Sequence, residues 1–226
     1  MRKKDVYISV RIIIIFIIIL TGMVLFNAAL SSQYTELMPS SFFAALPDLF
    51  LPEKKLSVGR FLVATKQIQG SFFSETVILL TRYDMRGAAG LIINRLTDVK
   101  LSAIFPKIDG ILERKDTVFI GGPVAGDQML MLIRSATKHE RSHHLFKDIY
   151  ISSSLELLQH MIRETSEGVV FRAYVGYAGW AAGQLDREIS RGSWYVFHAD
   201  AKTIFDKAPS KIWPELFRLG SAQYII

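Results

Sequence analysis

Short apolar runs separated by polar or glycine-containing segments fill the chain from residue 57 onward. Runs of this kind are typical of strands that are buried on one or both faces. We predict strands at 61–64, 76–81, 90–94, 117–120, 128–133, 148–152, 171–177 and 194–198. Short helices are predicted at 101–105, 153–162, 184–190, 202–206 and 212–218. Many hairpin-like steps with interspersed helices indicate an α+β fold with a mixed, curved, largely antiparallel sheet and flanking helices.

Two local patterns add detail to this prediction. The strands at 117–120 and 128–133 flank the loop Gly-Gly-Pro-Val-Ala-Gly-Asp, so we expect them to pair as a hairpin. Ser153 and Glu156 have the spacing of a capping box ahead of an apolar periodic run. That spacing predicts that a helix begins there.

A different pattern occupies the N-terminal part of the chain, where residues 12–30 are nineteen consecutive uncharged residues. A helix of that length would span about 28 Å, close to the hydrocarbon thickness of a bilayer. Basic residues precede the run, and the next charged residues are the acidic Glu36, Asp48 and Glu53. The positive-inside bias then places the N-terminus in the cytoplasm. We therefore expect a single-pass transmembrane helix, with the folded domain across the membrane.

Two other interpretations of the apolar run stay open. A cleaved signal peptide fits the basic start, although Asn27 and Ala29 are a poor pair for a small-residue cleavage site. The domain would then be secreted or periplasmic. The third interpretation is a buried helix of a soluble protein. The predicted division of the chain is a basic cytoplasmic tail at 1–11, a transmembrane helix at 12–30, a linker at 31–56 and a folded domain at 57–226.

Charge and composition narrow the function classes. The formal net charge is +6, and four basic residues and one acidic residue among the first eleven supply half of it. The rest of the chain is only mildly basic, whereas a DNA-binding face must neutralise many phosphates. Nucleic acid is therefore not an expected partner. The chain has no cysteine, which excludes disulfides, thiolate metal ligands and a cysteine nucleophile.

The most informative segment covers residues 175–189, VGYAGWAAGQLDREI. It combines three glycines with two aromatic residues, a glutamine and two carboxylates. Each glycine costs backbone entropy unless the fold needs its small size or a positive φ. We therefore expect a strand that packs tightly against the helix after it. The segment resembles the signature of the AlgH/YqgE family, GYAGW-x-x-GQLE-x-E, with Asp186 in place of the first glutamate.

Three further blocks carry the same resemblance across the predicted domain. They are GRFLVAT with FSETVILL at 59–80, GAAGLIINR at 87–95 and GGPV at 121–124. The chain departs from the family pattern at Leu96, where a proline is usual, and around Lys66, Ile68 and Gly70. The resemblance implies a single α+β domain with a regulatory or binding role. It also implies a cytoplasmic location as an alternative to the membrane, and some family members are labelled transcriptional regulators.

Polar and glycine residues of these blocks are candidates for the lining of a ligand cleft. The candidate ligand-binding residues are Asn94, Arg95, Gly121, Gly122, Tyr177, Trp180 and Gln184. Asp186 and Glu188 are two residues apart and so do not share a helix face, which argues for salt-bridge or cap roles instead of paired acid–base chemistry. The glycines before the predicted helix could cradle an anion, but these carboxylates would repel a phosphate there.

Residues 139–143 read HERSH and match H-E-x-x-H, a pattern that places two zinc ligands on one face of a buried helix. The preceding residues lack an apolar stripe, and no third ligand is apparent. We interpret the stretch as a polar loop and expect neither a resident metal nor a cofactor. His198, at the end of a predicted strand, is assigned to packing.

These observations predict a membrane-anchored AlgH/YqgE-like domain that acts as a regulatory module or binds a protein or small molecule. One alternative is a hydrolase-like enzyme that uses a cleft near Asn94, Tyr177 and Gln184. The other is a transcriptional regulator, as the family label suggests. No G-x-S-x-G elbow and no Ser-His-Asp set was found, so the catalytic residues of an enzyme are not assigned.

We expect the full-length protein to stay with the membrane fraction, because residues 12–30 are long and apolar enough to remain in a bilayer. The folded domain should be accessible to protease from the non-cytoplasmic side only. Cell fractionation followed by protease treatment of sealed membranes checks both points, with a variant that lacks residues 12–30 as the soluble control. A soluble native protein whose chain begins near residue 31 would establish cleavage instead.

Overall fold

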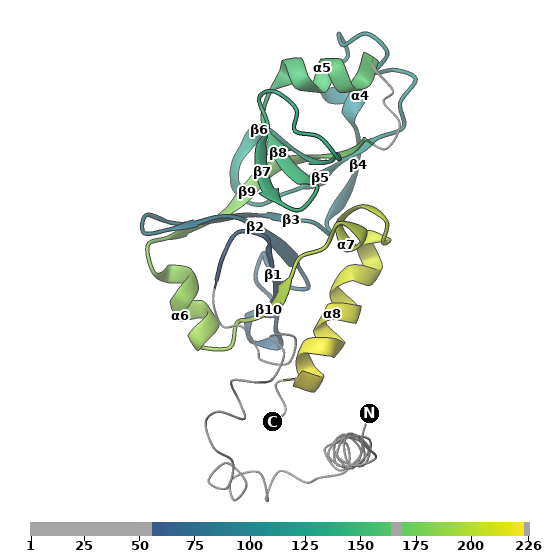
Figure 1. Ribbon diagram of the computed structural model, residues 1–226. Helices are drawn as coiled ribbons and strands as arrows, with labels where there is room; N and C mark the ends of the chain where they lie inside the picture. The colour runs from purple at the N-terminus through teal and green to yellow at the C-terminus, as the bar shows by residue number, and fades with distance from the viewer. Residues whose placement is uncertain (1–55, 164–168, 224–226) are drawn as a thin grey trace, which may run out of the picture. The chain divides into compact units, whose positions relative to one another are not determined.

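Figure 1 shows the computed structural model of the chain, which describes residues 56–163 and 169–223. These residues belong to one compact unit, Lys54–Ile225. The predicted transmembrane segment 12–30 and the linker up to residue 55 lie outside the described residues. None of the described helices is long and apolar enough to cross a membrane.

The described residues form one sheet of ten strands. The strands are β1 (Arg60–Ala64), β2 (Val77–Asp84), β3 (Gly87–Ile92), β4 (Leu96–Lys100), β5 (Thr117–Ile120), β6 (Val124–Arg134), β7 (His143–Phe146), β8 (Ile149–Ser152), β9 (Val170–Ala181) and β10 (Trp194–His198). The helices are the 3₁₀ turn η1 (Lys66–Ile68), α4 (Leu101–Ile104), α5 (Leu155–Arg163), α6 (Gln184–Ser190), α7 (Ala201–Phe205) and α8 (Pro209–Gln223).

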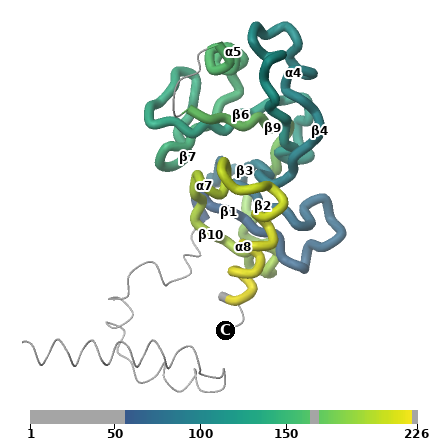
Figure 2. Tube along the Cα trace, turned by 90° about the vertical axis from the view of Figure 1, so that its right-hand side faces the viewer, coloured from purple at the N-terminus to yellow at the C-terminus, as the bar shows by residue number. Residues whose placement is uncertain are grey.

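The long strand β9 joins the two halves of this sheet. Its C-terminal part pairs with β3, which continues through β2 and β1 to β10. Its N-terminal part pairs with β6, which continues through β8 to β7. On the other edge β9 also pairs with β5, and β5 pairs with β4. In Figures 1 and 2, β9 accordingly passes from the half that carries α4 and α5 into the half that carries α6, α7 and α8.

Strand alternation divides the buried side chains between the two faces of the sheet. In β1, Phe61 and Val63 belong to the cluster that α7 and α8 cover. Leu62 and Ala64, one residue out of phase, belong to the cluster on the other face, where α6 packs. In Figure 1, α6 and α8 lie on opposite sides of this half of the sheet. Helix α5 supplies a third cluster, in which Leu158 packs with residues of β6, β8 and β9.

The fold-class prediction is confirmed for the described residues. They form an α+β domain with a curved, mainly antiparallel sheet and flanking helices. Within the described ranges, β5 and β9 are the strands that pair in parallel. The predicted strand at 194–198 and the predicted helix at 184–190 match β10 and α6 residue for residue.

The predicted hairpin of 117–120 with 128–133 is wrong. β5 and β6 do not pair with each other, because β9 lies between them, parallel to β5 and antiparallel to β6. The glycines of the connection explain the difference, since Gly121 and Gly122 let the chain cross directly over β9. The N–H of Gly121 donates to the carbonyl of Val175 at 2.8 Å.

The predicted capping box is also wrong in its residues. The side chain of Ser154, not Ser153, accepts the N–H of Leu157 at 3.2 Å and so caps α5. Glu156 does not bond back to the cap; it forms an ion pair with Arg141. Two short strands, β4 and β7, escaped prediction because their sequences are largely polar and mostly exposed.

Glycines allow the main chain of β9 to touch the 121–122 segment. Gly176 has φ +67, and a Cβ placed on it would lie 2.4 Å from the carbonyl oxygen of Gly122. A Cβ on Gly121 would lie 2.3 Å from the carbonyl oxygen of Gly176. The expected tight packing is therefore present at Gly176, but its partner is this crossing segment and not the helix that follows.

Replacing Gly176 with alanine should destabilise the protein by about 3 kcal/mol or more, since the new methyl group adds overlap to the strain of a positive φ. The free energy of unfolding, from urea titration followed by circular dichroism, measures the effect. Gly70→Ala is the matched control, because Gly70 has φ +81 but open space around its Cβ position. Its expected cost is about 1 kcal/mol. Equal losses in the two variants would contradict the close main-chain contact.

Candidate functional site

Asn94 and Arg95 hold the loop before β2. The side-chain oxygen of Asn94 accepts the N–H of Val77 at 2.8 Å, and its amide nitrogen donates to the carbonyl of Glu75 at 2.9 Å. Arg95 donates to the carbonyl of Phe72 at 2.8 Å, and its guanidinium lies 4.7 Å from the centre of the Phe72 ring. Partial burial lowers the pKa of Arg95 below its ordinary value. Both side chains therefore have structural partners.

Trp180 and Gln184 belong to a network centred on the carboxylate of Glu188. One carboxylate oxygen accepts the indole N–H of Trp180 at 2.8 Å and that of Trp194 at 2.9 Å. The other oxygen accepts the side-chain amide of Gln184 at 2.9 Å. Both tryptophans are buried. Because buried N–H groups need acceptors, the glutamate of the signature is explained by this network.

The two carboxylates of α6 have separate roles, as their spacing predicts. Asp186 lies in the first turn of α6, where its charge complements the helix dipole. It accepts the hydroxyl of Tyr83 at 2.5 Å, which raises the pKa of Tyr83. Glu188 faces the two tryptophans instead.

The remaining candidates lie where β9 crosses its neighbours. Gly121 and Gly122 contact the main chain of β9 directly. Tyr177 packs against the cluster under α7 and α8, whereas Trp180 belongs to the cluster under α6. The seven candidates are thus spread over both faces of the sheet, and none of them lines either of the two clefts described below. A ligand-binding role for these residues stays a prediction.

The H-E-x-x-H match does not lie on a helix. Glu140 and Arg141 form a turn, and His143 begins β7. A ring nitrogen of His139 lies 3.0 Å from the hydroxyl oxygen of Ser135. Among the described residues, no group of His, Asp and Glu side chains is arranged to hold a metal ion. Because residues 140 and 141 form a turn, the loop interpretation is right there, but it missed the strand at 143–146.

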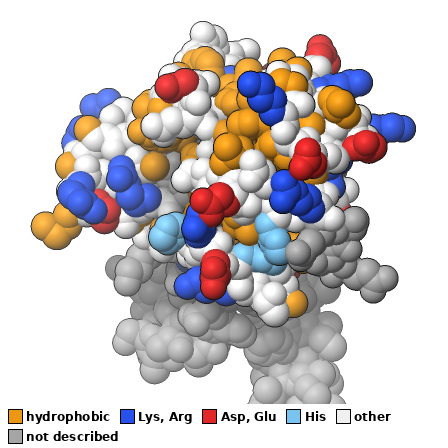
Figure 3. Space-filling model, turned by 90° about the horizontal axis from the view of Figure 1, so that it is seen from above, with side chains coloured by type: hydrophobic (Ala, Val, Ile, Leu, Met, Phe, Trp, Pro, Cys, Tyr) orange, Lys and Arg blue, Asp and Glu red, His pale blue; other side chains and the backbone are white. Residues whose placement is uncertain are grey.

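A small cleft of about 380 Å³ lies beside this turn. Its lining residues are His139, Glu140, Arg141, Glu156, Leu157 and His160. The facing charges of Arg141 and Glu156 are paired with each other. Figure 3 shows histidine side chains on the same face as the exposed hydrophobic side chains of this half.

A larger cleft of about 450 Å³ opens where β5 and β9 separate. The two strands pair only from Phe119 with Tyr174 to Ile120 with Val175, and they diverge before these residues. The lining residues are Leu96, Lys115, Asp116, Thr117, Phe119, Val170, Phe171, Arg172, Ala173 and Pro209. Its volume falls within the usual range of ligand pockets.

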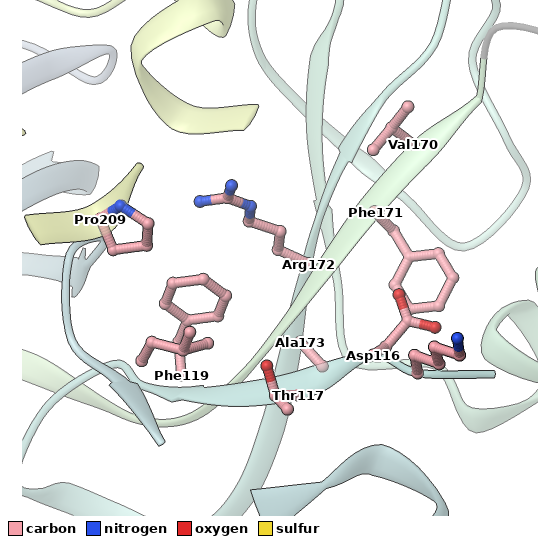
Figure 4. Close-up of a pocket in the computed structure, with 10 residues that line it drawn as sticks. Asp116, Thr117, Phe119, Val170, Phe171, Arg172, Ala173 and Pro209 are labelled. Carbon is pink, nitrogen blue, oxygen red and sulfur yellow. The ribbon is translucent and has the colours of Figure 1, made fainter. Parts of the chain in front are cut away.

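Arg172 is the prominent polar group of this cleft. Figure 4 shows its side chain extending from β9 toward Pro209, with the Phe119 ring beneath it. The guanidinium lies 4.9 Å from the centre of that ring and donates from Nη2 to the carbonyl of Phe205 at 3.0 Å. Its other terminal nitrogen, Nη1, is buried and has no hydrogen-bond partner among the described residues.

The surroundings of Arg172 leave its positive charge only partly compensated. Asp206 is nearby, but both of its oxygens accept from Arg134 at 2.9 Å. This pairing, with a smaller contribution from the charge of Arg172, lowers the pKa of Asp206. Tyr174 is fully buried, and burial raises its pKa, whereas the charge of Arg172 and a side-chain contact with Arg172 lower it. By hydrogen-bond geometry, however, neither the Tyr174 hydroxyl nor Nη1 of Arg172 has a well-formed hydrogen bond within the described residues. Two arginines therefore share one carboxylate here.

Sequence reasoning missed Arg172, although a signal for it was present. Arg172 is the one charged residue of β9, a strand whose other residues are apolar or glycine. A charged side chain in such a strand is rarely buried without a partner, so it marks a position where charge is needed. The family blocks drew attention to the C-terminal part of β9 instead.

The fold places the protein in a class: an α+β domain whose two sheet halves share a glycine-containing strand. The chain belongs to the AlgH-like family, because the family model (DUF179) matches residues 61–225. The UPF0301 protein of Bordetella petrii is 35% identical over 164 residues, which cover 71% of this chain and 81% of that protein. The UPF0301 protein of Chlamydia abortus is 29% identical, with 77% and 92% covered.

Two solved structures are similar to the chain. The solution structure of the AlgH protein from Pseudomonas aeruginosa has a TM-score of 0.60 at 26% identity, and the match covers 76% of this chain and 93% of that one. A crystal structure of a protein from Corynebacterium diphtheriae has a TM-score of 0.63 at 21% identity, with 79% and 92% covered. The latter similarity concerns the fold alone.

Replacing Glu188 with alanine should lower the free energy of unfolding by about 2–4 kcal/mol, because two buried indole N–H groups lose their acceptor. Urea unfolding followed by tryptophan fluorescence measures the change. Asp186→Ala, two residues earlier on the same helix, removes an exposed acceptor and should cost less than about 1 kcal/mol. A Glu188 variant as stable as the Asp186 variant would mean that the network contributes little.

Proposed function

We propose that this AlgH-like domain is a binding module for an anionic ligand or protein segment, and that the cleft between β5 and β9 is its binding site. The observation that carries the proposal is the buried Nη1 of Arg172, which lacks a partner beside that cleft. A guanidinium with an open donor suits a carboxylate, since charge-assisted hydrogen bonds are stronger than neutral ones. Lys115 adds a second positive charge to the lining.

The polar groups around the cleft favour binding over catalysis. Asp116, the acidic residue of the lining, accepts from Arg114 at 2.6 Å and is thereby engaged. The residues of the hydrolase alternative, Asn94 and Gln184, are committed to hydrogen bonds that hold a loop and a helix. A general base needs a free lone pair within reach of a substrate proton. Binding therefore fits the geometry better than proton transfer.

The proposal includes a membrane tether formed by residues 12–30. Its support is the sequence alone: a long uncharged run with basic residues before it. A tether would hold the binding module at a membrane surface, where a regulatory domain can meet membrane-bound partners. The mild net charge of the rest of the chain favours a protein or small molecule over DNA as the ligand.

The proposal predicts that the full-length protein, purified in detergent micelles, retains anionic compounds from a mixed set of small carboxylates and short acidic peptides. Affinity selection with mass spectrometry identifies what is retained. Arg172→Met should weaken retention about tenfold or more, because the ion-assisted hydrogen bond is lost. Arg82→Met, a change at an exposed strand position, is the matched control and should retain as the native protein does.

Retention of nothing, or equal retention by the Arg172 variant, would overturn the proposal. Arg172 also bonds to the carbonyl of Phe205, so the melting temperature of each variant is measured alongside. Arg172→Lys keeps the charge and serves as a second variant. It should retain more than the methionine variant, because part of the electrostatic attraction remains.

A further inference from the structure

We propose that the ligand of the β5–β9 cleft is a short extended peptide with an acidic side chain, which adds as a strand to the free edge of β9. This inference rests on the proposed function and names the class of its ligand. Three features of the cleft support it: an unpaired strand edge, an arginine beside that edge whose charge is only partly compensated, and an apolar floor.

The edge of β9 that faces the cleft is unpaired at its N-terminal end. Main-chain groups of a strand point alternately to its two sides. The carbonyl of Val175 accepts from Gly121, on the side of β5, so the groups of Ala173 and Phe171 face that side as well. The β5 register ends at the pair of Phe119 with Tyr174, and it offers no strand partner to Phe171.

Phe171 is itself a buried residue, with 7% of its surface exposed. Buried main-chain groups need hydrogen-bond partners, and an incoming peptide main chain supplies a donor and an acceptor together. Strand addition to an open sheet edge is a recurring mode of peptide recognition. A compact small molecule would satisfy Arg172 but would leave this edge unpaired.

The position of Arg172 then selects the side chain of the peptide. In paired strands, residues that lie opposite each other project to the same face of the sheet. The peptide residue opposite Arg172 would therefore project toward its guanidinium, on the face where Phe119 forms the floor. The nearby carboxylate of Asp206 is held by Arg134, so an acidic residue at that position would complete the charge balance.

Other surfaces of the described residues carry less weight. The cleft at 139–160 has its facing charges, Arg141 and Glu156, paired already. Hydrophobic side chains gather on the face shown in Figure 3, with charged side chains around them. Leu112 and Leu155 are exposed large hydrophobics in this half of the sheet. Nothing in the structure indicates what would cover them.

The test uses two libraries of acetylated, amidated heptapeptides, with aspartate or asparagine fixed at the centre and the other positions randomised. The immobilised full-length protein should retain the aspartate library about tenfold better. Arg172→Met should abolish the difference, and Arg82→Met should preserve it. Equal retention of the two libraries, or retention of neither, would overturn the inference.

A second measurement changes only the peptide and so does not depend on the folding of a variant. Each residue of a selected peptide is N-methylated in turn, and the dissociation constant is measured by calorimetry. Strand addition predicts losses of about tenfold at alternate positions and little change between them, because only alternate N–H groups face β9. A uniform response, or none, would contradict strand pairing.

Small carboxylates provide the outcome that separates the two proposals. If they bind in an Arg172-dependent manner while both peptide libraries fail, the peptide inference is refuted and the proposed anionic site stands. If neither peptides nor carboxylates bind, both are refuted.

Discussion

The direct contact between the main chain of β9 and the 121–122 segment is the constraint on which this fold depends. Side chains are absent at Gly121, Gly122 and Gly176, so hydrogen-bonded backbone segments meet without the spacing that a Cβ would impose. The crossing puts β5 on one edge of β9 and β6 on the other. One strand thereby enters both halves of the sheet, and the three buried clusters all include residues of β9.

The same crossing has a second consequence, because it fixes β5 to β9 only over a short stretch. Before Phe119 and Tyr174, the two strands separate and leave the cleft that Arg172 faces. At the other end of β9, by contrast, Glu188 of α6 accepts hydrogen bonds from Trp180 and Trp194 and so holds α6 against the sheet. The C-terminal end of β9 is therefore held by hydrogen bonds to α6, whereas its N-terminal end has an unpaired edge. This asymmetry places binding at the N-terminal end of the strand.

The sequence predicted those elements whose apolar pattern is local. β10 and α6 were placed correctly because a buried strand and a helix after a glycine have clear signals. The partner of β5 was predicted wrongly, since parallel pairing with a strand some fifty residues away leaves no mark in local periodicity. β4 and β7 are short polar strands that depend on their neighbours for pairing, which their own composition does not reveal.

The candidate site was harder to predict than the fold, for a physical reason. The signature residues Trp180, Gln184 and Glu188 look functional in sequence, but they satisfy one another. Arg172 is marked in sequence only as the one charged residue of β9, and the sequence does not show that its Nη1 lacks a well-formed hydrogen bond. Polar residues that satisfy one another and polar residues that are available to a ligand differ in their hydrogen-bond geometry, not in their amino-acid type.

Residue-resolved hydrogen exchange along β9 in the ligand-free protein tests this account most directly. The amides of Arg172 and Tyr174 face β6 and should be strongly protected, whereas the amide of Phe171 faces the open cleft and should exchange much faster. Protection of Phe171 equal to that of its neighbours would show that the edge is already paired. The central claim, an open strand edge beside Arg172, would then be contradicted.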